Sequence, residues 1–218
     1  RTDGRVLTLA SAHSSRVIVK DEYGNRIGLV RDANGRPLRA YEVDTDRYNV
    51  RYAYNADGNL EFVSYPDSTP DTAGDNPFGE DNPYRQYHYE SPVDADLLTG
   101  VTDENGVRHR TIEYDAEGRA TSSGLGDGSL EGSTLDYSDL LDASDPRTRV
   151  TNALGKDTVY HFATVAGLRR VIAVEGLASA NCLADTQSRE YDTETGWLLS
   201  EVDRGGAQTT YAYYTDAA

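Results

Sequence analysis

Residues 102–120 read TDENGVRHRTIEYDAEGRA, in which two short turn motifs flank a segment of strand length. Each motif consists of Asp, two further residues and Gly, at 103–106 and at 115–118. The Asp side chain can accept hydrogen bonds from the turn backbone, and Gly adopts the positive φ that closes a type I turn with a bulge. Residues 110–114 alternate between polar and apolar, which is the period of a β-strand. The stretch therefore predicts a strand between two hairpin tips.

The same motif, with Asp or Asn in first place, recurs along the sequence. Successive glycines lie 10, 11 or 12 residues apart where copies are adjacent, which is one strand plus one turn. Tyr precedes the Asp or Asn in three copies, at Tyr54, Tyr114 and Tyr191. The glycines of the predicted tips are Gly24, Gly35, Gly58, Gly106, Gly118, Gly155, Gly196 and Gly206. We therefore expect an all-β chain built as an antiparallel strip of hairpins, with single helical turns at most over 94–99 and 135–143.

Three regions depart from this regular spacing of strands and turns. Residues 66–83 are acidic and contain four prolines, so they are expected to form an insertion loop. Residues 124–146 are rich in Gly and Asp and are expected to form a loop region around a short strand at 133–137. Residues 1–15 give no clear assignment. The sequence lacks Met, also at position 1, and we expect residues 1–218 to be a single repeat segment that continues beyond both ends.

The composition limits both the core and the partners. Of 218 residues, 37 % are hydrophobic and the mean hydropathy is −0.66, so the core is expected to be thin. The net charge of −16 argues against binding to nucleic acid and to anionic lipid. No apolar run is long enough to span a membrane. The single cysteine, Cys182, excludes an internal disulfide; we expect an inert thiol in a loop, the alternative being a partner outside these residues.

The repeat resembles the YD repeats of RHS proteins over residues 16–218. The resemblance rests on five stretches: YHYE at 87–90, TDENGV at 102–107, YDAEGRA at 114–120, VTNALG at 150–155 and GLRRV at 167–171. In that family the strands form a long strip that spirals into a hollow shell. In bacterial RHS proteins and toxin-complex C components the shell encloses a C-terminal toxin, and in teneurins a related barrel serves cell adhesion.

The resemblance implies a structural segment of an RHS-type shell, in a secreted or cell-surface protein, that encloses or delivers a toxin or effector. Its expected partners are the flanking segments of its own chain, an enclosed toxin domain and further copies of itself. Two alternatives remain open. One is an adhesion or carbohydrate-binding module that uses the Tyr-rich strands, and the other is a subunit of an extracellular filament or coat.

The sequence offers no set of catalytic residues. The self-cleaving Asp-Pro-x-Gly-Leu motif of the family is absent, because Asp145-Pro146 is followed by Arg147-Thr148. The four histidines form no HExxH motif, and there is no Gly-x-Ser-x-Gly elbow. We therefore expect no enzyme and no organic cofactor.

A weak Ca²⁺ site is the one candidate for a bound ion. Its ligands would come from one acidic loop, since Ca²⁺ takes six to eight oxygen ligands from flexible loops. The alternative is a solvated acidic loop. The candidate residues are Asp71, Asp75, Glu80 and Asp81.

Overall fold

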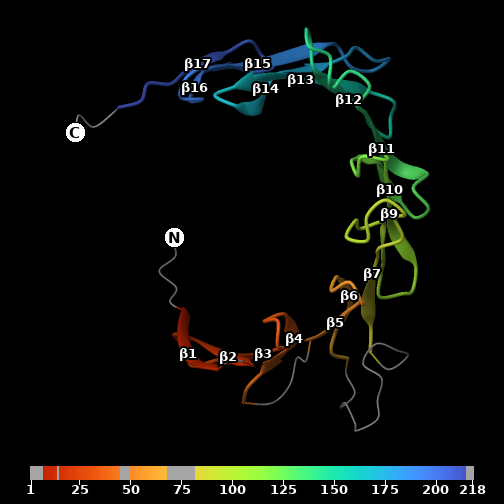
Figure 1. Ribbon diagram of the computed structural model, residues 1–218, viewed down its shortest axis with the longest axis vertical. Helices are drawn as coiled ribbons and strands as arrows, with labels where there is room; N and C mark the ends of the chain where they lie inside the picture. Colours follow the sequence, from red (N-terminus) through yellow and green to blue (C-terminus); the bar gives the residue numbers. More distant parts are fainter. Residues whose placement is uncertain (1–6, 14, 45–49, 68–81, 215–218) are drawn as a thin grey trace. The chain divides into compact units, whose positions relative to one another are not determined.

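All regular elements in the described part of the chain are β-strands (Figure 1). The computed structural model describes residues 7–13, 15–44, 50–67 and 82–214. The first nine strands are β1 (Leu7–His13), β2 (Arg16–Asp21), β3 (Arg26–Arg31), β4 (Pro37–Glu42), β5 (Val50–Tyr54), β6 (Leu60–Ser64), β7 (Tyr84–His88), β8 (Gly100–Thr102) and β9 (Arg108–Tyr114). The remaining strands are β10 (Ala120–Leu125), β11 (Leu130–Asp136), β12 (Arg147–Thr151), β13 (Asp157–Val165), β14 (Leu168–Gly176), β15 (Asp185–Tyr191), β16 (Leu198–Val202) and β17 (Gln208–Thr210). The all-β prediction is confirmed.

Each strand pairs antiparallel with the next strand in the sequence. The pairing runs without a crossover from β1 to β9, continues from β9 to β10, and runs on to β17. The predicted strip of hairpins is therefore present. The chain divides into two compact units, residues 1–111 and 112–218, and the boundary lies inside β9.

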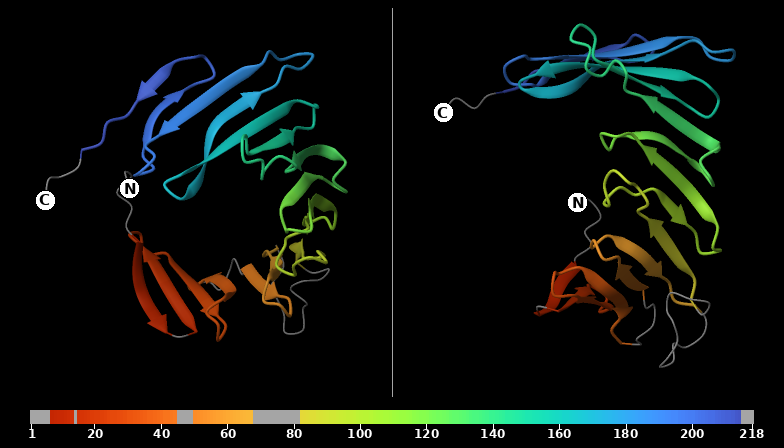
Figure 2. Two further views of the ribbon diagram at one scale, coloured as in Figure 1. Left: turned by 45° about the horizontal axis from the view of Figure 1, so that its top comes forward. Right: turned by 45° about the vertical axis from the view of Figure 1, so that its right-hand side comes forward.

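Within each unit the strands lie in a single layer (Figure 2). A single layer buries few side chains, because neither face packs against a second sheet of the same unit. The buried hydrophobic residues among those described are Tyr41, Val63, Val159, Val165 and Val174. Stability must therefore come largely from backbone pairing, from the turns and from half-buried side chains that cover their neighbours.

Neither of the two helical turns that the sequence allowed is present. Residues 94–99 form a non-helical turn, closed by a hydrogen bond from the Leu97 amide to the Asp94 carbonyl at 3.3 Å. Residues 135–136 belong to β11, and residues 138–141 form a turn. Asp and Ser side chains cap these turns locally, which favours a turn over a continued helix.

Strands occupy part of the unassigned lead-in and more of the expected loop region 124–146 than the short strand predicted there. The lead-in at 1–15 includes β1, and the region 124–146 includes the end of β10 and all of β11. Strand β11 begins at Leu130, three residues before the predicted start. Its first residues carry Gly and Ser, which are weak strand formers, and pairing with the neighbouring strands decides their conformation.

The insertion at 66–83 leaves strand pairing intact on both sides of it. The Tyr65 amide donates to the Pro83 carbonyl at 2.9 Å, directly beyond the β6–β7 ladder. The Ca²⁺ candidates Asp71, Asp75, Glu80 and Asp81 lie outside the described residues.

Replacement of Gly106 by Val tests the tip conformation. Gly106 has φ +72°, and a Cβ built there meets nothing within 4 Å, so the cost is backbone strain and not a clash. We expect Gly106→Val to lower the free energy of unfolding by about 1–2 kcal/mol. Gly106→Asn should cost less, because Asn tolerates the left-handed region. Urea denaturation measures both, and equal losses for the two variants would contradict this assignment.

Candidate functional site

The hairpin tips share one hydrogen-bond pattern, built by the Asp or Asn that begins each motif. At Asp103 the carboxylate Oδ1 accepts from the amides of Asn105 and Val107, both at 3.0 Å. The Gly106 amide donates to the Asp103 carbonyl at 3.0 Å, and the Asp103 amide donates to the Val107 carbonyl at 2.9 Å. One side chain thus holds two amides of its own turn, as an Asx-turn does.

The same four bonds occur at six other tips. They begin at Asp21, Asp32, Asn55, Asp115, Asn152 and Asp203. The tip at Asp192 is one residue longer, and its Oδ1 accepts from the Glu194 and Thr195 amides instead. All eight predicted tip glycines have positive φ, between +72° and +96°.

At two tips an arginine directly after the glycine binds back to the capping carboxylate. Arg36 Nε donates to Asp32 Oδ2 at 2.8 Å, and Arg119 Nε donates to Asp115 Oδ2 at 2.7 Å. Both carboxylates therefore bind amides through one oxygen and a guanidinium through the other. These are partly exposed ion pairs, so their main effect is to fix the direction of the arginine side chain.

Each of these arginines also lies over a tyrosine ring that follows 18 residues later. The Arg36 guanidinium is 4.4 Å from the centre of the Tyr54 ring, and the Tyr54 hydroxyl donates to the Pro37 carbonyl at 2.8 Å. The Arg119 guanidinium is 4.7 Å from the Tyr137 ring, and the Tyr137 hydroxyl donates to the Ala120 carbonyl at 2.9 Å. We call this arrangement the ring clamp. A planar side chain covers a tyrosine ring, and the tyrosine hydroxyl donates to the carbonyl of the residue that directly follows that side chain in the sequence.

Two further ring clamps lie in the unit formed by residues 112–218. Arg170 lies 5.5 Å from the Tyr191 ring, and the Tyr191 hydroxyl donates to the Val171 carbonyl at 3.3 Å.

In the last clamp Trp197 takes the place of the arginine. Its ring lies 4.7 Å from the Tyr213 ring, and the Tyr213 hydroxyl donates to the Leu198 carbonyl at 2.9 Å. An aromatic pair thus replaces the cation–π pair, while the tyrosine keeps its bond to the next carbonyl.

The sequence identified two of the four clamp tyrosines, Tyr54 and Tyr191. It missed Tyr137 and Tyr213. Tyr137 follows Arg119 by 18 residues, which is also the separation of Tyr54 from Arg36, so this spacing could have marked Tyr137. The third predicted tyrosine, Tyr114, ends β9, and burial raises its pKa.

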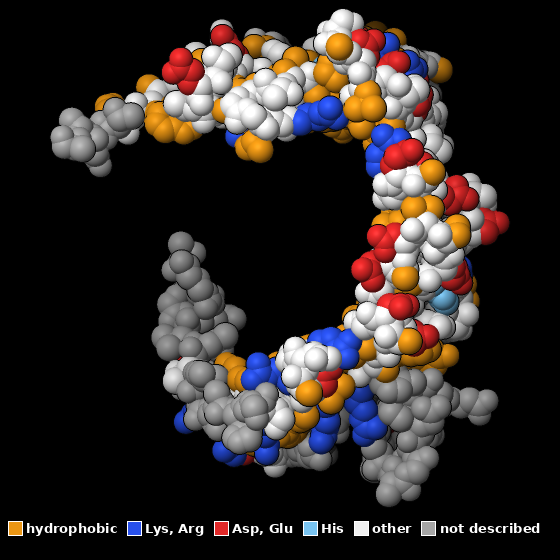
Figure 3. Space-filling model, viewed as in Figure 1, with side chains coloured by type: hydrophobic (Ala, Val, Ile, Leu, Met, Phe, Trp, Pro, Cys, Tyr) orange, Lys and Arg blue, Asp and Glu red, His pale blue; other side chains and the backbone are white. Residues whose placement is uncertain are grey.

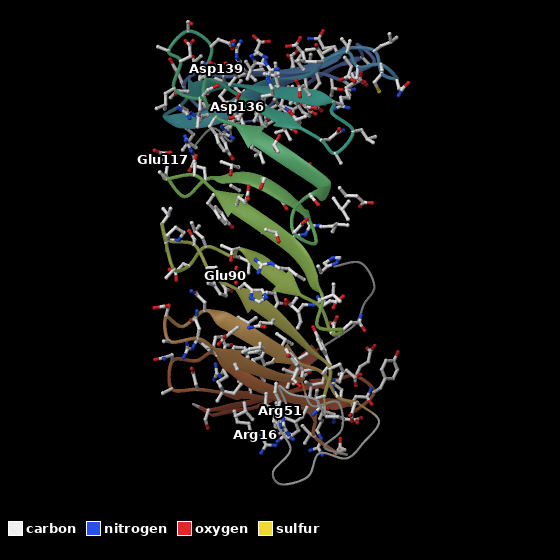
Figure 4. The ribbon with its side chains drawn as sticks, turned by 90° about the vertical axis from the view of Figure 1, so that its right-hand side faces the viewer. Arg16, Arg51, Glu90, Glu117, Asp136 and Asp139 are labelled. Atoms are coloured by element: carbon white, nitrogen blue, oxygen red, sulfur yellow. The ribbon has the colours of Figure 1, made fainter. Side chains whose placement is uncertain are left out.

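An open cleft of about 710 Å³ lies beside the clamp of Arg119 and Tyr137. Its acidic side chains include Glu117 and Asp136, which Figure 4 labels together with nearby Asp139. Glu117 is ion-paired to Arg119 at 3.0 Å, and Asp136 accepts from the Ser138 amide at 2.9 Å. These carboxylates bind groups of the local turns.

Two histidines lie within polar networks of the sheet. His88 Nε2 is 2.7 Å from Thr102 Oγ1, and burial lowers the pKa of His88. His161 Nδ1 is 2.8 Å from Asp145 Oδ1, and this hydrogen bond lowers the pKa of Asp145. Each contact joins residues on different segments within one unit.

Neither a metal-ligand cluster nor a membrane-spanning helix is present among the described residues. No group of three or more His, Cys, Asp or Glu side chains is placed there to hold a metal ion. The same part of the chain has no helix of the length and hydropathy needed to cross a membrane. Cys182 is a free, exposed thiol in a turn closed by the Ser179 amide and the Cys182 carbonyl.

Of the comparisons with known proteins, the one with solved structures gives a match. No family model matches the sequence, and no curated protein matches it. A solved structure described as the crystal structure of TcdB2-TccC3-Cdc42 is similar over 90 % of this chain, with 13 % sequence identity and a TM-score of 0.45. The present chain spans 12 % of that chain. At this level the match carries no conclusion about what the present chain does.

Substitution of the clamp tyrosine tests how much the ring clamp stabilises the sheet. Tyr137→Phe keeps the ring under Arg119 and removes only the bond to the Ala120 carbonyl. We expect the free energy of unfolding to fall by about 0.5–1.5 kcal/mol in urea denaturation. Tyr214→Phe is the control, since Tyr214 is 97 % exposed. Equal stabilities of the two variants would show that the hydroxyl contributes nothing.

The capping aspartates predict a loss of stability in acid. The Val107 amide, more than any other group, holds the pKa of Asp103 below its ordinary value of 3.8. The charged form therefore stabilises the fold above that value, and the stabilisation disappears as the pH falls through the lowered pKa. Asp103→Asn should keep the turn, as Asn55 and Asn152 do, and should weaken the dependence of stability on pH between about 5 and 2. Thermal melts across that range measure this, and identical pH profiles would contradict it.

Proposed function

We propose that the chain is a non-catalytic wall segment of an RHS-type shell that encloses or delivers a toxin or effector. The observation that carries the proposal is the recurring tip, in which the polar side chains of the repeat bind the backbone of their own hairpins. Catalysis requires an activated group held in a cleft. Here the recurring Asp, Asn, Arg and Tyr side chains build turns and clamps, which suits a wall.

The arginine-covered tyrosines favour this function over a carbohydrate-binding module that would use them. A sugar-binding platform needs exposed aromatic faces. Tyr54, Tyr137 and Tyr191 each have an arginine over the ring and a hydroxyl bound to a backbone carbonyl. These groups are therefore engaged within the sheet, and binding a sugar would require them to give up these contacts.

The resemblance of the repeat to YD repeats supplies the remainder of the proposal. By that resemblance, the protein is secreted or exposed at a cell surface, and its partners are neighbouring segments of the same chain, further copies of it and an enclosed domain. The edge strands of a wall present unpaired backbone N–H and C=O groups. Pairing with further segments of the strip would satisfy these groups.

Proteolysis of the natural full-length chain tests the enclosure. A domain that the wall encloses should resist proteinase K under native conditions and be cleaved rapidly when expressed alone. A pair of tip variants, Gly106→Val and Gly155→Val, should open the wall and remove the protection, while the matched Gly→Asn pair should retain it. Equal cleavage rates for the enclosed and the free domain would overturn the proposal. So would a hydrolase activity towards sugars, esters or peptides that a single carboxylate substitution abolishes.

A further inference from the structure

Two hairpin tips carry Asn directly before the tip glycine, at Asn34-Gly35 and Asn105-Gly106. These are the two Asn-Gly pairs of the sequence, and both asparagines are exposed. Asn is a chemically labile residue, because the backbone amide of the next residue can attack its side-chain carbonyl carbon. A following glycine favours this attack, since it has no side chain to obstruct the approach.

The two tips are held by the same turn bonds. The Gly35 amide donates to the Asp32 carbonyl and the Gly106 amide to the Asp103 carbonyl, both at 3.0 Å. The asparagine amides donate to the Oδ1 atoms of the same aspartates, at 2.9 and 3.0 Å. A glycine amide that donates in this way is not free to attack, so the tip must first open locally. The rate of attack therefore reports how often each tip opens.

The tip of Asn34 has an additional anchor, the side chain of Arg36. Its Nε donates to Asp32 Oδ2 at 2.8 Å, and its Nη1 donates to the Gly58 carbonyl of the β5–β6 tip at 3.1 Å. The same guanidinium lies 4.4 Å from the centre of the Tyr54 ring. Opening of this tip would disturb three contacts that the turn itself does not supply.

At the tip of Asn105, valine takes the place of the anchoring arginine. The Val107 side chain cannot bind the Asp103 carboxylate, so it adds nothing to the cap. Glu104 pairs with Arg85 at 2.9 Å, but this partly exposed ion pair holds the residue before the asparagine and not the glycine amide that attacks. We therefore expect this tip to open more often than the tip of the anchored asparagine.

We propose that Asn105 deamidates spontaneously in the folded chain and that Arg36 protects Asn34 from the same reaction. Hydroxide removes the amide proton of Gly106, and the amide nitrogen forms a bond to Asn105 Cγ. The Cγ–Nδ2 bond breaks, and the side-chain nitrogen leaves as ammonia with a proton taken from water. Water then opens the resulting succinimide at either carbonyl, which yields Asp or isoaspartate. The net reaction consumes water, releases ammonia and involves no oxidation or reduction.

The product changes both the charge and the backbone of this tip. Deamidation replaces a neutral amide by a carboxylate close to Asp103 and Glu104, and like charges repel. Figure 3 shows acidic side chains over β9 and its neighbours, so the new charge enters a region that is already acidic. Isoaspartate also adds a methylene group to the main chain, which alters the turn that sets the register of β8 with β9. The inference goes beyond the proposed function and does not depend on it.

Incubation of the intact chain at mildly alkaline pH tests the proposal. Peptide mapping by mass spectrometry, after digestion at acidic pH, separates the Asn, Asp and isoaspartate forms of each tip. We expect Asn105 to be converted about fivefold faster than Asn34, the difference that a partly exposed ion pair and a cation–π contact would make to tip opening. In denaturing urea the two sites should react at similar rates, because each is then followed by an accessible glycine amide.

Two reciprocal variants move the anchor. Arg36→Gln removes it and should bring Asn34 to the rate of Asn105, while the rate at Asn105 stays unchanged as the internal control. Val107→Arg supplies an arginine at the equivalent position and should slow conversion of Asn105. Arg204→Gln is the matched control and should change neither rate, because Arg204 is an exposed arginine of the other unit.

Each possible outcome decides the question. Equal rates at the two asparagines in the folded chain, or faster conversion of Asn34, would overturn the proposal. So would acceleration of both sites in Arg36→Gln, which would mean that the arginine stabilises the whole unit and not one tip. An unchanged rate at Asn105 in Val107→Arg would likewise overturn it. Protection from protease, which tests the wall, is a separate measurement and does not change with these results.

Discussion

The bond from one Asp or Asn side chain to two amides of its own turn is the interaction on which the rest of the structure depends. In a single layer with few buried side chains, such local bonds are important for fixing where one strand ends and the next begins. The cap at Asp103 fixes the turn, the turn fixes the register of β8 with β9, and the register decides which side chains share a face. Repetition of this local device at eight tips therefore builds much of the strip.

The ring clamps extend the same principle from one hairpin to the next. Arg36 and Arg119 leave the capped turn in a fixed direction because the capping carboxylate binds them. Each then covers a tyrosine at the end of the strand that pairs with the strand following the arginine. The clamp at Trp197 shows that the geometry, and not the charge, is the shared requirement. The clamps partly replace the buried core that a single layer lacks.

The sequence predicted the features that depend on local chemistry and missed those that depend on contacts through space. The tips at Gly106 and Gly118 follow from Asp and Gly at fixed spacing, and both were found. The β13–β14 turn was missed because it has no capping Asp or Asn: its two residues, Ala166 and Gly167, take positive φ by themselves. The partners of each clamp lie at the ends of two adjacent strands but 16 to 21 residues apart in the sequence, so no short motif marks them.

Net charge does not show which charged side chains lie together. It averages over the chain, whereas local charge depends on the few residues that the register places on one face. Arg39 and Arg51 are twelve positions apart in the sequence, yet they are direct cross-strand neighbours. Composition alone does not reveal such a pair of basic residues in a strongly acidic chain.

Pairing of each strand with its sequence neighbours alone has a consequence for how such a chain is made and taken apart. Contacts between residues close in the sequence require little loop closure, so each hairpin can form soon after its second strand is synthesised. Conversely, a pull on one end loads the outermost strand first, and its loss leaves the next hairpin with its own cap and pairing. The strip is therefore suited to being threaded through a narrow opening one hairpin at a time, without the simultaneous disruption that a shared core would require.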